Sequence, residues 1–234
     1  MKTLKIFLIA LFHVGLLFAQ DVNQVDTEGK NHGVWKKNFE KTNVLRYEGT
    51  FFHGKEVGTF KFYKNIKNKP VLSATKDFNN DNDKAYVKFF ASTGKLISEG
   101  EMDGKTYVGE WKYYQKTNDK LLTLERYDNA GNLIGERLVY YPNGQIAEVQ
   151  HYKTGKLDGF SKVYSDKNVL LSEVHYLNGE LHGYSKYYTS KGELVTEGNY
   201  KNGKKEGVWK YYENGKLIEE KDFNAPPVNT KKTP

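Results

Sequence analysis

The sequence predicts an all-β fold, an elongated antiparallel meander of β-hairpins built from about eight similar repeats. Three observations lead to this prediction. A unit of about 24 residues recurs between residues 29 and 223, and a fixed period of this length is typical of stacked supersecondary units. Aromatic pairs that favour strands recur within each unit. Glycines that permit tight turns separate the aromatic segments.

Each repeat begins with a small residue that opens the first strand expected in it. These residues are spaced by 24 to 27 positions, at Gly33, Gly58, Ala85, Gly109, Gly135, Gly159, Gly183 and Gly207. The strand that follows usually has the sequence lysine–aromatic–aromatic, as in residues 112–114 and 210–212. Because side chains alternate between the faces of a strand, the two rings of a pair point to opposite sides of the sheet. Trp111 and Trp209, each next to such a lysine, share a face with the first ring.

A hairpin turn and a second strand complete each repeat. Asn143–Gly144 and Asn214–Gly215 are pairs that two-residue hairpin turns prefer, because both positions take positive φ. The second strand contains a glutamate followed three residues later by a ring, as in Glu48 to Phe51. These glutamates recur opposite the lysines, so we expect cross-strand Lys–Glu pairs. A Gly-x-x-x-Gly linker, as in residues 203–207, leads into the next repeat.

Some repeats depart from this pattern in ways that carry structural expectations. Residues 64–70 lengthen one hairpin loop, and the first repeat, around Trp35, lacks the aromatic pair and is expected to be a degenerate cap. Ser161 and Ser185 replace the aromatic residue that precedes the lysine. They are expected to interrupt a ladder of rings on that face. Without cysteine in the chain, packing and strand pairing must stabilise the sheet.

The spacing of rings and glycines resembles that of a known repeat family. Phe51 to Gly58 follows the aromatic-x-x-Gly-x-x-x-Gly core of MORN repeats, and residues 152–159, 176–183 and 200–207 repeat it. The Lys-Tyr-Tyr and Asn-Gly-x-Leu segments that follow are similar to the bacterial MORN-variant repeat of proteins labelled YwqK-family antitoxins. The resemblance covers residues 29–223 and departs at Ala85 and across the third and fifth repeats. It implies a repeat sheet from a family that includes scaffolds, dimerisation modules and proposed phospholipid binders.

The two ends of the chain differ from the repeats. Residues 1–19 have the pattern of a secretory signal peptide, with an apolar run after Lys2 and Lys5 and a cleavage position near Ala19. The run is about 13 residues, shorter than the roughly 20 that cross a bilayer; an uncleaved anchor is the alternative. We expect residues 20–28 to be a short linker and residues 224–234 a disordered tail. The expected location is the periplasm or the outside of the cell.

The sequence contains no catalytic constellation, and we predict a protein without enzymatic activity, cofactor or metal site. The histidines after residue 19 do not cluster in the sequence; a stacked His151/His175 pair is the one alternative that the repeat period allows. Residues 77–83 alternate oxygen ligands as a calcium loop does, but Asn82 takes its glycine position and an acidic turn is favoured. The net charge is +7, yet lysine and glutamate alternate through the repeats, so nucleic acid is not an expected partner.

The predicted function is non-catalytic binding of another protein through one face or an edge of the sheet. The candidate contact residues are Trp111, Tyr113, Tyr187, Trp209 and Tyr211. Open edges offer unpaired backbone groups, so self-association by strand addition is also expected. The alternative function is a lipid- or glycan-binding module at the cell envelope, which would use the same rings together with the repeated lysines.

Overall fold

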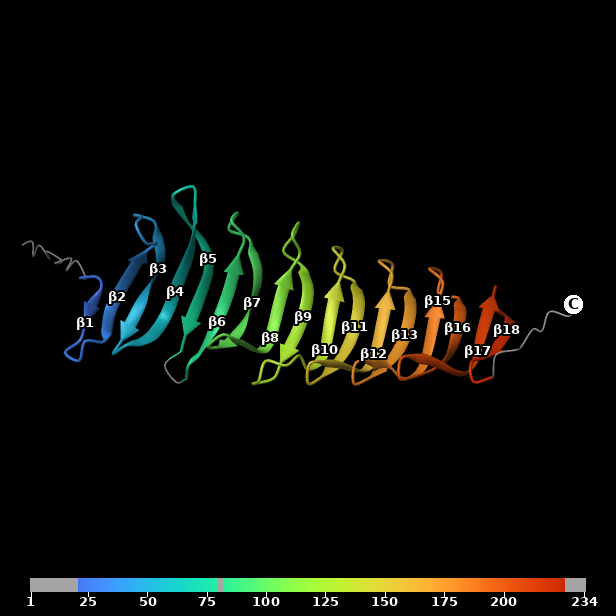
Figure 1. The fold of residues 1–234 in the computed structure, drawn as a ribbon. Helices are drawn as coiled ribbons and strands as arrows, with labels where there is room; N and C mark the ends of the chain where they lie inside the picture. Colours follow the sequence, from blue (N-terminus) through green and yellow to red (C-terminus); the bar gives the residue numbers. More distant parts are fainter. Residues whose placement is uncertain (1–20, 80–81, 226–234) are drawn as a thin grey trace, which may run out of the picture.

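The protein forms one elongated sheet of hairpins that follow one another along the sequence, from blue to red in Figure 1. The computed structural model describes residues 21–79 and 82–225. The expected signal peptide, residues 80–81 of the calcium-like loop and residues 226–234 of the expected tail lie outside the described residues. Within the described ranges there is no helix, and hence none with the length and apolar character that spanning a bilayer requires.

The first nine strands cover the N-terminal half of the sheet. They are β1 Gln24–Val25, β2 Asn31–Asn38, β3 Leu45–Phe52, β4 Lys55–Ile66, β5 Lys69–Phe78, β6 Lys84–Phe90, β7 Leu96–Asp103, β8 Thr106–Tyr114 and β9 Leu121–Tyr127. The remaining strands are β10 Gly135–Tyr140, β11 Ile146–Lys153, β12 Lys156–Tyr164, β13 Leu170–Leu177, β14 Glu180–Leu181, β15 Gly183–Tyr188, β16 Leu194–Lys201, β17 Lys204–Glu213 and β18 Lys216–Asp222.

Each strand pairs antiparallel with its sequence neighbours, which confirms the predicted hairpin meander. Strands β14 and β15 both pair with β13, so they are two pieces of one strand. Counted in this way, β2 to β18 form the eight hairpins that the repeats predict. A further two-residue strand, β1, pairs with β2 and lies in the segment that was expected to be a linker.

The hairpin turns are of two kinds, and only one of them matches the prediction. Asn214 and Gly215 both have positive φ, 49° and 73°, as the predicted two-residue turn requires. At Asn143–Gly144 the prediction is wrong, because only Gly144 has positive φ, 94°. The chain there forms a longer loop, closed by a hydrogen bond of 2.8 Å from the N–H of Gly144 to the carbonyl of Tyr141. Loop length explains the difference, because Tyr140 pairs with Ile146 whereas Tyr212 pairs with Leu217, one residue nearer in sequence. The same turn closes at Gly94 and Gly192 without a proline, although the fixed φ of Pro142 suits its first central position.

The core of this thin sheet consists of aromatic rings that lie on glycines of the preceding strand. The side chains of Phe60, Trp111 and Trp209 are 0% exposed. A Cβ added to Gly100 would lie 2.5 Å from the indole of Trp111, and one added to Gly198 would lie 2.5 Å from that of Trp209. Only a residue without a side chain therefore lets each ring lie against the backbone.

The indole N–H groups fix the two tryptophan rings in place. Trp111 donates to the carbonyl of Glu101 at 2.8 Å, and Trp209 donates to that of Asn199 at 3.0 Å. In both cases the acceptor belongs to the residue that follows the glycine under the ring. Each tryptophan therefore satisfies its polar group while it buries a large apolar surface.

Where the ladder of rings is interrupted, both the ring and the glycine of the preceding strand are replaced by other residues. Ser161 and Ser185 take the ring position and are buried, and the corresponding glycine position holds Gln150 and Val174. A small residue is thus matched by a larger one in the preceding strand. This finding confirms the predicted interruption and shows how the volume of the missing ring is replaced.

Substitution of Gly198 by alanine tests the packing of ring on glycine. The new methyl group would overlap the indole of Trp209, so we expect the free energy of unfolding to fall by about 1–3 kcal/mol. In a Trp209→Ser background the same substitution should cost nothing, because alanine is favoured over glycine in a strand by roughly 0.5–1 kcal/mol. Urea unfolding of the four proteins measures the coupling. An equal cost in both backgrounds would contradict the proposed contact.

Candidate binding surface

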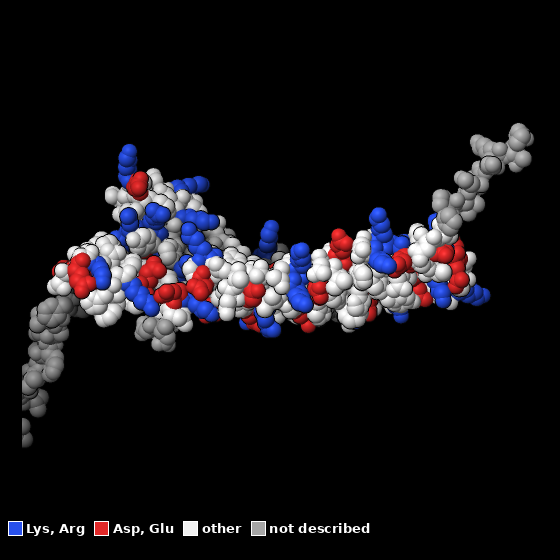
Figure 2. All heavy atoms as spheres, turned by 60° about the horizontal axis from the view of Figure 1, so that its bottom comes forward, with Lys and Arg blue, Asp and Glu red and all other residues white. Residues whose placement is uncertain are grey.

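The sheet has two chemically different faces. The ring face carries Phe60, Trp111 and Trp209 together with the first ring of each aromatic pair, such as Tyr113. The charge face is the opposite one and carries the repeated lysines, such as Lys112 and Lys210, because neighbouring residues of a strand point to opposite sides. Figure 2 shows that basic and acidic side chains are interspersed along the length of the molecule in that view.

A row of alternating charges crosses the charge face from one end of the sheet to the other. Its members are aligned by the strand register as Lys36, Glu48, Lys61, Thr75, Lys88, Glu99, Lys112, Leu124, Leu138, Val149, Lys162, Glu173, Lys186, Glu197, Lys210 and Glu220. The predicted cross-strand Lys–Glu pairs are confirmed by this register. Only the centre of the row, at Leu124, Leu138 and Val149, is apolar.

Some glutamates of the row, such as Glu48 and Glu197, interact with a tyrosine hydroxyl as well as with a lysine. Glu48 accepts a hydrogen bond of 2.7 Å from the hydroxyl of Tyr63 and lies 3.6 Å from the ammonium of Lys36. Glu197 likewise accepts a hydrogen bond of 2.7 Å from Tyr212. The hydrogen bonds from Tyr184 and Tyr212 lower the pKa of Glu197, in that order and together with the charges of the neighbouring lysines. Glu197 is therefore anionic at neutral pH.

The row of lysines and glutamates, which we call the charge row, determines the distribution of charge on this face but contributes little to stability. The ion pairs are open to solvent, with separations such as 3.3 Å for Lys162–Glu173 and 3.9 Å for Lys210–Glu220. Exposed pairs of this kind contribute roughly 0.2–1 kcal/mol each. Over the last three repeats, three lysines alternate with three glutamates, so this part of the row has no net charge.

Exposed apolar side chains gather beside the row over the last three repeats. Phe160, Tyr184 and Val208 are 40%, 45% and 49% exposed, and each directly follows the glycine that opens its repeat. Successive members are about 10 Å apart, because one strand separates them. We call these three side chains the apolar patch.

Aromatic and basic side chains surround the first two members of the apolar patch. The ring of His175 packs on Phe160 at a centroid distance of 3.6 Å. Burial lowers the pKa of His175, so its ring is uncharged at neutral pH. The ammonium groups of Lys162 and Lys186 each lie 5.6 Å from the ring centre of the preceding aromatic residue, Phe160 and Tyr184. The patch is thus apolar at its centre and charged along one side.

The residues predicted as contacts lie on the other face, and two of them are inaccessible. Trp111 and Trp209 are 0% exposed, so neither indole has surface through which to contact a partner. Tyr107 stacks on Trp111 at 3.9 Å, and the ammonium of Lys205 lies 3.9 Å from the ring centre of Trp209. We call Tyr107 and Lys205 the lids of the two tryptophans. Each lid lies near the start of the strand that also carries the covered ring. Between lid and ring lies a glycine with positive φ, Gly109 at 66° and Gly207 at 65°.

The other three predicted contacts, Tyr113, Tyr187 and Tyr211, are half-buried on the ring face. Burial is the largest cause that raises the pKa of Tyr113 to about 12. Burial, followed by the hydrogen bond with the hydroxyl of Tyr200, also raises the pKa of Tyr187. The role of these tyrosines in binding stays a prediction. Sequence reasoning missed the apolar patch, although the residue after each repeat-opening glycine could have been compared between repeats.

The edges of the sheet differ at its two ends. Strand β18 is exposed along its whole length, whereas β1 covers only the first residues of β2. An exposed outer strand offers unpaired backbone groups to another chain. Self-association through this edge stays a prediction.

The histidines are not all isolated, which corrects one expectation from the sequence. The rings of His32 and His53 lie side by side with centroids 4.9 Å apart, and Asp26 is next to them. The suggested pair His151/His175 is not formed. Strand β12 separates the two, since His151 interacts with the carbonyl of Phe160 at 3.0 Å and His175 packs on the Phe160 ring.

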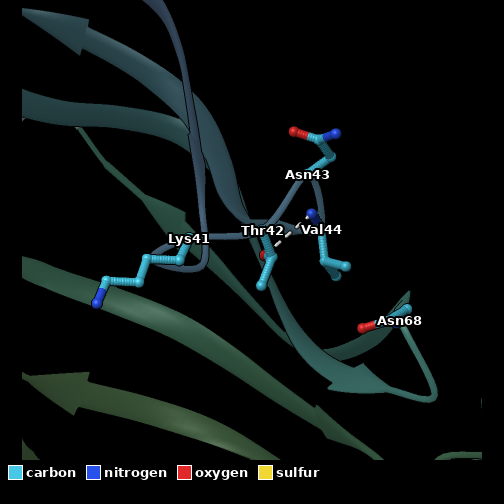
Figure 3. A pocket seen from close by; sticks show the side chains of 5 residues that line it. All are labelled: Lys41, Thr42, Asn43, Val44 and Asn68. Atoms are coloured by element: carbon cyan, nitrogen blue, oxygen red, sulfur yellow. Dashed lines mark hydrogen bonds between the residues drawn. The ribbon is translucent and has the colours of Figure 1, made fainter.

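An open hollow between two hairpin tips is shown in Figure 3. It is lined by Lys41, Thr42, Asn43 and Val44 from the β2–β3 turn and by Asn68 from the β4–β5 turn. The hydroxyl of Thr42 accepts a hydrogen bond of 3.2 Å from the N–H of Val44, and the side chain of Lys41 points away from the other four. The lining pairs no acid with a base or nucleophile, so its chemistry is that of a polar turn.

Comparison with known families agrees with the repeat structure. The family described as the MORN repeat variant matches residues 133–154, 181–202 and 205–225, and these segments contain, to within one residue, the hairpins β10–β11, β15–β16 and β17–β18. The chain therefore carries MORN repeats, as the resemblance implied. MORN repeats are generally protein- or membrane-binding modules, and all-β sheets of them are typically non-enzymatic. No curated protein matches the chain.

The half-buried tyrosines predict a characteristic alkaline transition. Burial, followed by the hydrogen bond to Glu48, raises the pKa of Tyr63 to about 12, and burial raises that of Tyr113 to about 12. Groups whose pKa is raised by folding stabilise the protein below the unfolded value of about 10. This contribution is lost as the pH rises from about 10 to about 12. We expect a late phase in tyrosinate absorbance that coincides with loss of strand circular dichroism.

Two controls belong to this titration. The protein in guanidinium should titrate in one phase near the ordinary value of about 10, and Tyr63→Phe should reduce the late phase by one residue. Ionisation of every tyrosine near pH 10 with the strand signal intact would contradict the assignment.

Proposed function

We propose that this MORN-repeat protein is an exported, non-catalytic module that binds another protein through the charge face of its last three repeats. The observation that carries the proposal is the apolar patch of Phe160, Tyr184 and Val208, which lies exposed beside a balanced row of charges. Protein interfaces typically combine an apolar, often aromatic centre with a polar rim. The patch and the charge row have this arrangement.

The balance of charge favours a protein over an anionic membrane as the partner. Each lysine beside the patch is matched across the strands by Glu173, Glu197 or Glu220. Anionic lipid attracts clusters of unpaired basic residues, at about 1 kcal/mol for each one near the surface. The part of the row beside the patch has no net charge and gains little from such a surface, whereas alternating charges can be matched by a partner with the complementary order.

Two further parts of the proposal rest on separate observations. The absence of enzymatic activity is supported by the repeat architecture and by the polar hollow of Figure 3, whose lining holds no acid–base pair. Export is supported by the sequence of residues 1–19, with its charged start and apolar run. The periplasm or the outside of the cell is then the proposed location of the partner.

Site-specific crosslinking tests the binding face. A photoreactive amino acid is placed at position 184, in the apolar patch, or at position 113, on the ring face, and the full chain is expressed in its native cells. We expect a defined protein adduct from position 184 and none from position 113. The adduct at 184 should disappear when Phe160→Ser removes the neighbouring ring of the patch.

A matched variant separates loss of the patch from a general loss of exposed rings. Tyr86 is 42% exposed and occupies the corresponding position in the third repeat. Tyr86→Ser should leave the adduct at position 184 unchanged. A protein adduct from position 113 alone, or recovery of only lipid or polysaccharide from position 184, would contradict the proposed function. An adduct with a second copy of the chain would identify the chain itself as the partner.

The export part of the proposal has a test of its own. Cleavage near Ala19 predicts that the protein recovered from the cell envelope or the medium begins at or close to Gln20. Amino-terminal sequencing of the purified protein measures this directly. A cytoplasmic protein that retains Met1 would contradict export and leave the binding face to be judged by the crosslinks.

A further inference from the structure

Three side chains that can bind a metal meet at the N-terminal end of the sheet. Asp26 lies in the turn after β1, His32 is in β2, and His53 forms the turn between β3 and β4. One ligand atom from each lies within 4.8 Å of the other two. Nδ1 of His53 is 2.7 Å from Oδ2 of Asp26. The group unites residues that are far apart in sequence, because two turns bring them to one corner.

The carboxylate of Asp26 is oriented by the backbone around it. Its Oδ1 accepts hydrogen bonds of 2.9 Å from the N–H groups of Glu28 and Lys30, which leaves Oδ2 directed at His53. The side chain of Asp26 is only 8% exposed. These contacts fix the direction in which the carboxylate presents its second oxygen.

The two histidines are held by the hairpin turn itself. His53 and Gly54 both have positive φ, 47° and 82°, and form a tight turn. The N–H of Gly54 donates to the carbonyl of Asn31 at 2.8 Å, which ties this turn to the residue before His32. Phe52 packs against both imidazoles, with centroid distances of 5.5 Å to His32 and 4.5 Å to His53. The backbone therefore keeps the rings together.

Comparison between repeats shows that the turn does not require these side chains. The position of His53 is taken by Thr154, Asn178 and Asn202 in later repeats, where the same turn forms with positive φ. The position of His32 is taken by valine in the second repeat, at Val57. Across residues 21–79 and 82–225, this corner is the one place where three such ligands converge. The repeat pattern alone therefore does not account for the cluster.

We propose that Asp26, His32 and His53 bind one divalent transition-metal ion, with two imidazole nitrogens and one carboxylate oxygen as ligands. Such a ligand set suits zinc, with water at a fourth position. Zinc lies about 2.0–2.2 Å from these ligand types. A tetrahedral site therefore separates the ligand atoms by about 3.3 Å. The observed atoms span this value, from 2.7 Å to within 4.8 Å, so rotation of the side chains closes the site.

The bound ion would join three separate segments of the cap. It would connect the turn after β1, the start of β2 and the β3–β4 turn, and so hold the two-residue strand β1 at the end of the sheet. Lys30, whose backbone N–H contacts Asp26, does not oppose this, because its ammonium forms an ion pair of 2.7 Å with Glu28. An ion at this corner lies at the other end of the sheet from the apolar patch.

Zinc titration of the full, untagged chain after treatment with a chelator tests the proposal. Calorimetry should show one ion bound per chain, and the melting temperature should rise with zinc because the ion binds the folded state. His53→Asn keeps the turn, as Asn178 and Asn202 show, and should weaken zinc binding at least tenfold. Asp26→Asn should weaken it as well. Cobalt should give the intense visible absorption of a tetrahedral site in the wild type and lose it in both variants.

Matched controls separate this site from scattered surface histidines. His151→Val combined with His182→Asn should leave the affinity and the stoichiometry unchanged, and magnesium should not compete, because it prefers six oxygen ligands. Without metal, wild type and His53→Asn should both give the circular dichroism of a folded sheet. Saturable zinc binding that survives His53→Asn, or no saturable binding by the wild type, would overturn the proposal.

Discussion

The contact of an aromatic ring with a glycine of the preceding strand is the interaction on which this sheet depends. A single layer has no second sheet or helix to cover its apolar side chains, so each ring must be covered from within the layer. Gly49, Gly100 and Gly198 provide the space below Phe60, Trp111 and Trp209. Side chains such as Tyr107 and Lys205 then cover the rings from above. The ring face is consequently occupied by packing, which is why the proposed binding surface lies on the charge face.

The hairpins, their order and the Lys–Glu pairs could be predicted because each depends on neighbours in sequence or on the repeat period. The burial of Trp111 and Trp209 could not, because it requires the lids to turn back over the rings. The backbone between lid and ring follows this course because Gly109 and Gly207 have positive φ. A glycine in the sequence allows positive φ but does not require it. The same limit applies at Asn143–Gly144, where the length of the loop between the paired residues Tyr140 and Ile146, rather than the Asn-Gly pair, determines the turn.

The cluster at the N-terminal corner was beyond sequence reasoning for a different reason. Asp26 is placed by the pairing of β1 with β2, and a two-residue strand has too little pattern to be predicted. His32 and His53 are then brought together by the register of one hairpin and the turn of the next. The β1–β2 pairing, the register of the β2–β3 hairpin and the β3–β4 turn must all be known before it is clear that the three side chains are close together. The expectation of scattered histidines failed because it considered the sequence alone.

A regular repeat gives the same surface many times, so recognition at one place requires departures from the repeat. The charge row changes little along most of the sheet, while the residue after each repeat-opening position varies widely. In chain order it is Val34, Thr59, Tyr86, Glu110, Glu136, Phe160, Tyr184 and Val208. Exposed apolar side chains occupy this position in three adjacent repeats only at the C-terminal end. Side chains about 10 Å apart can be contacted by one partner. The apolar patch therefore distinguishes the C-terminal end of the sheet from its middle.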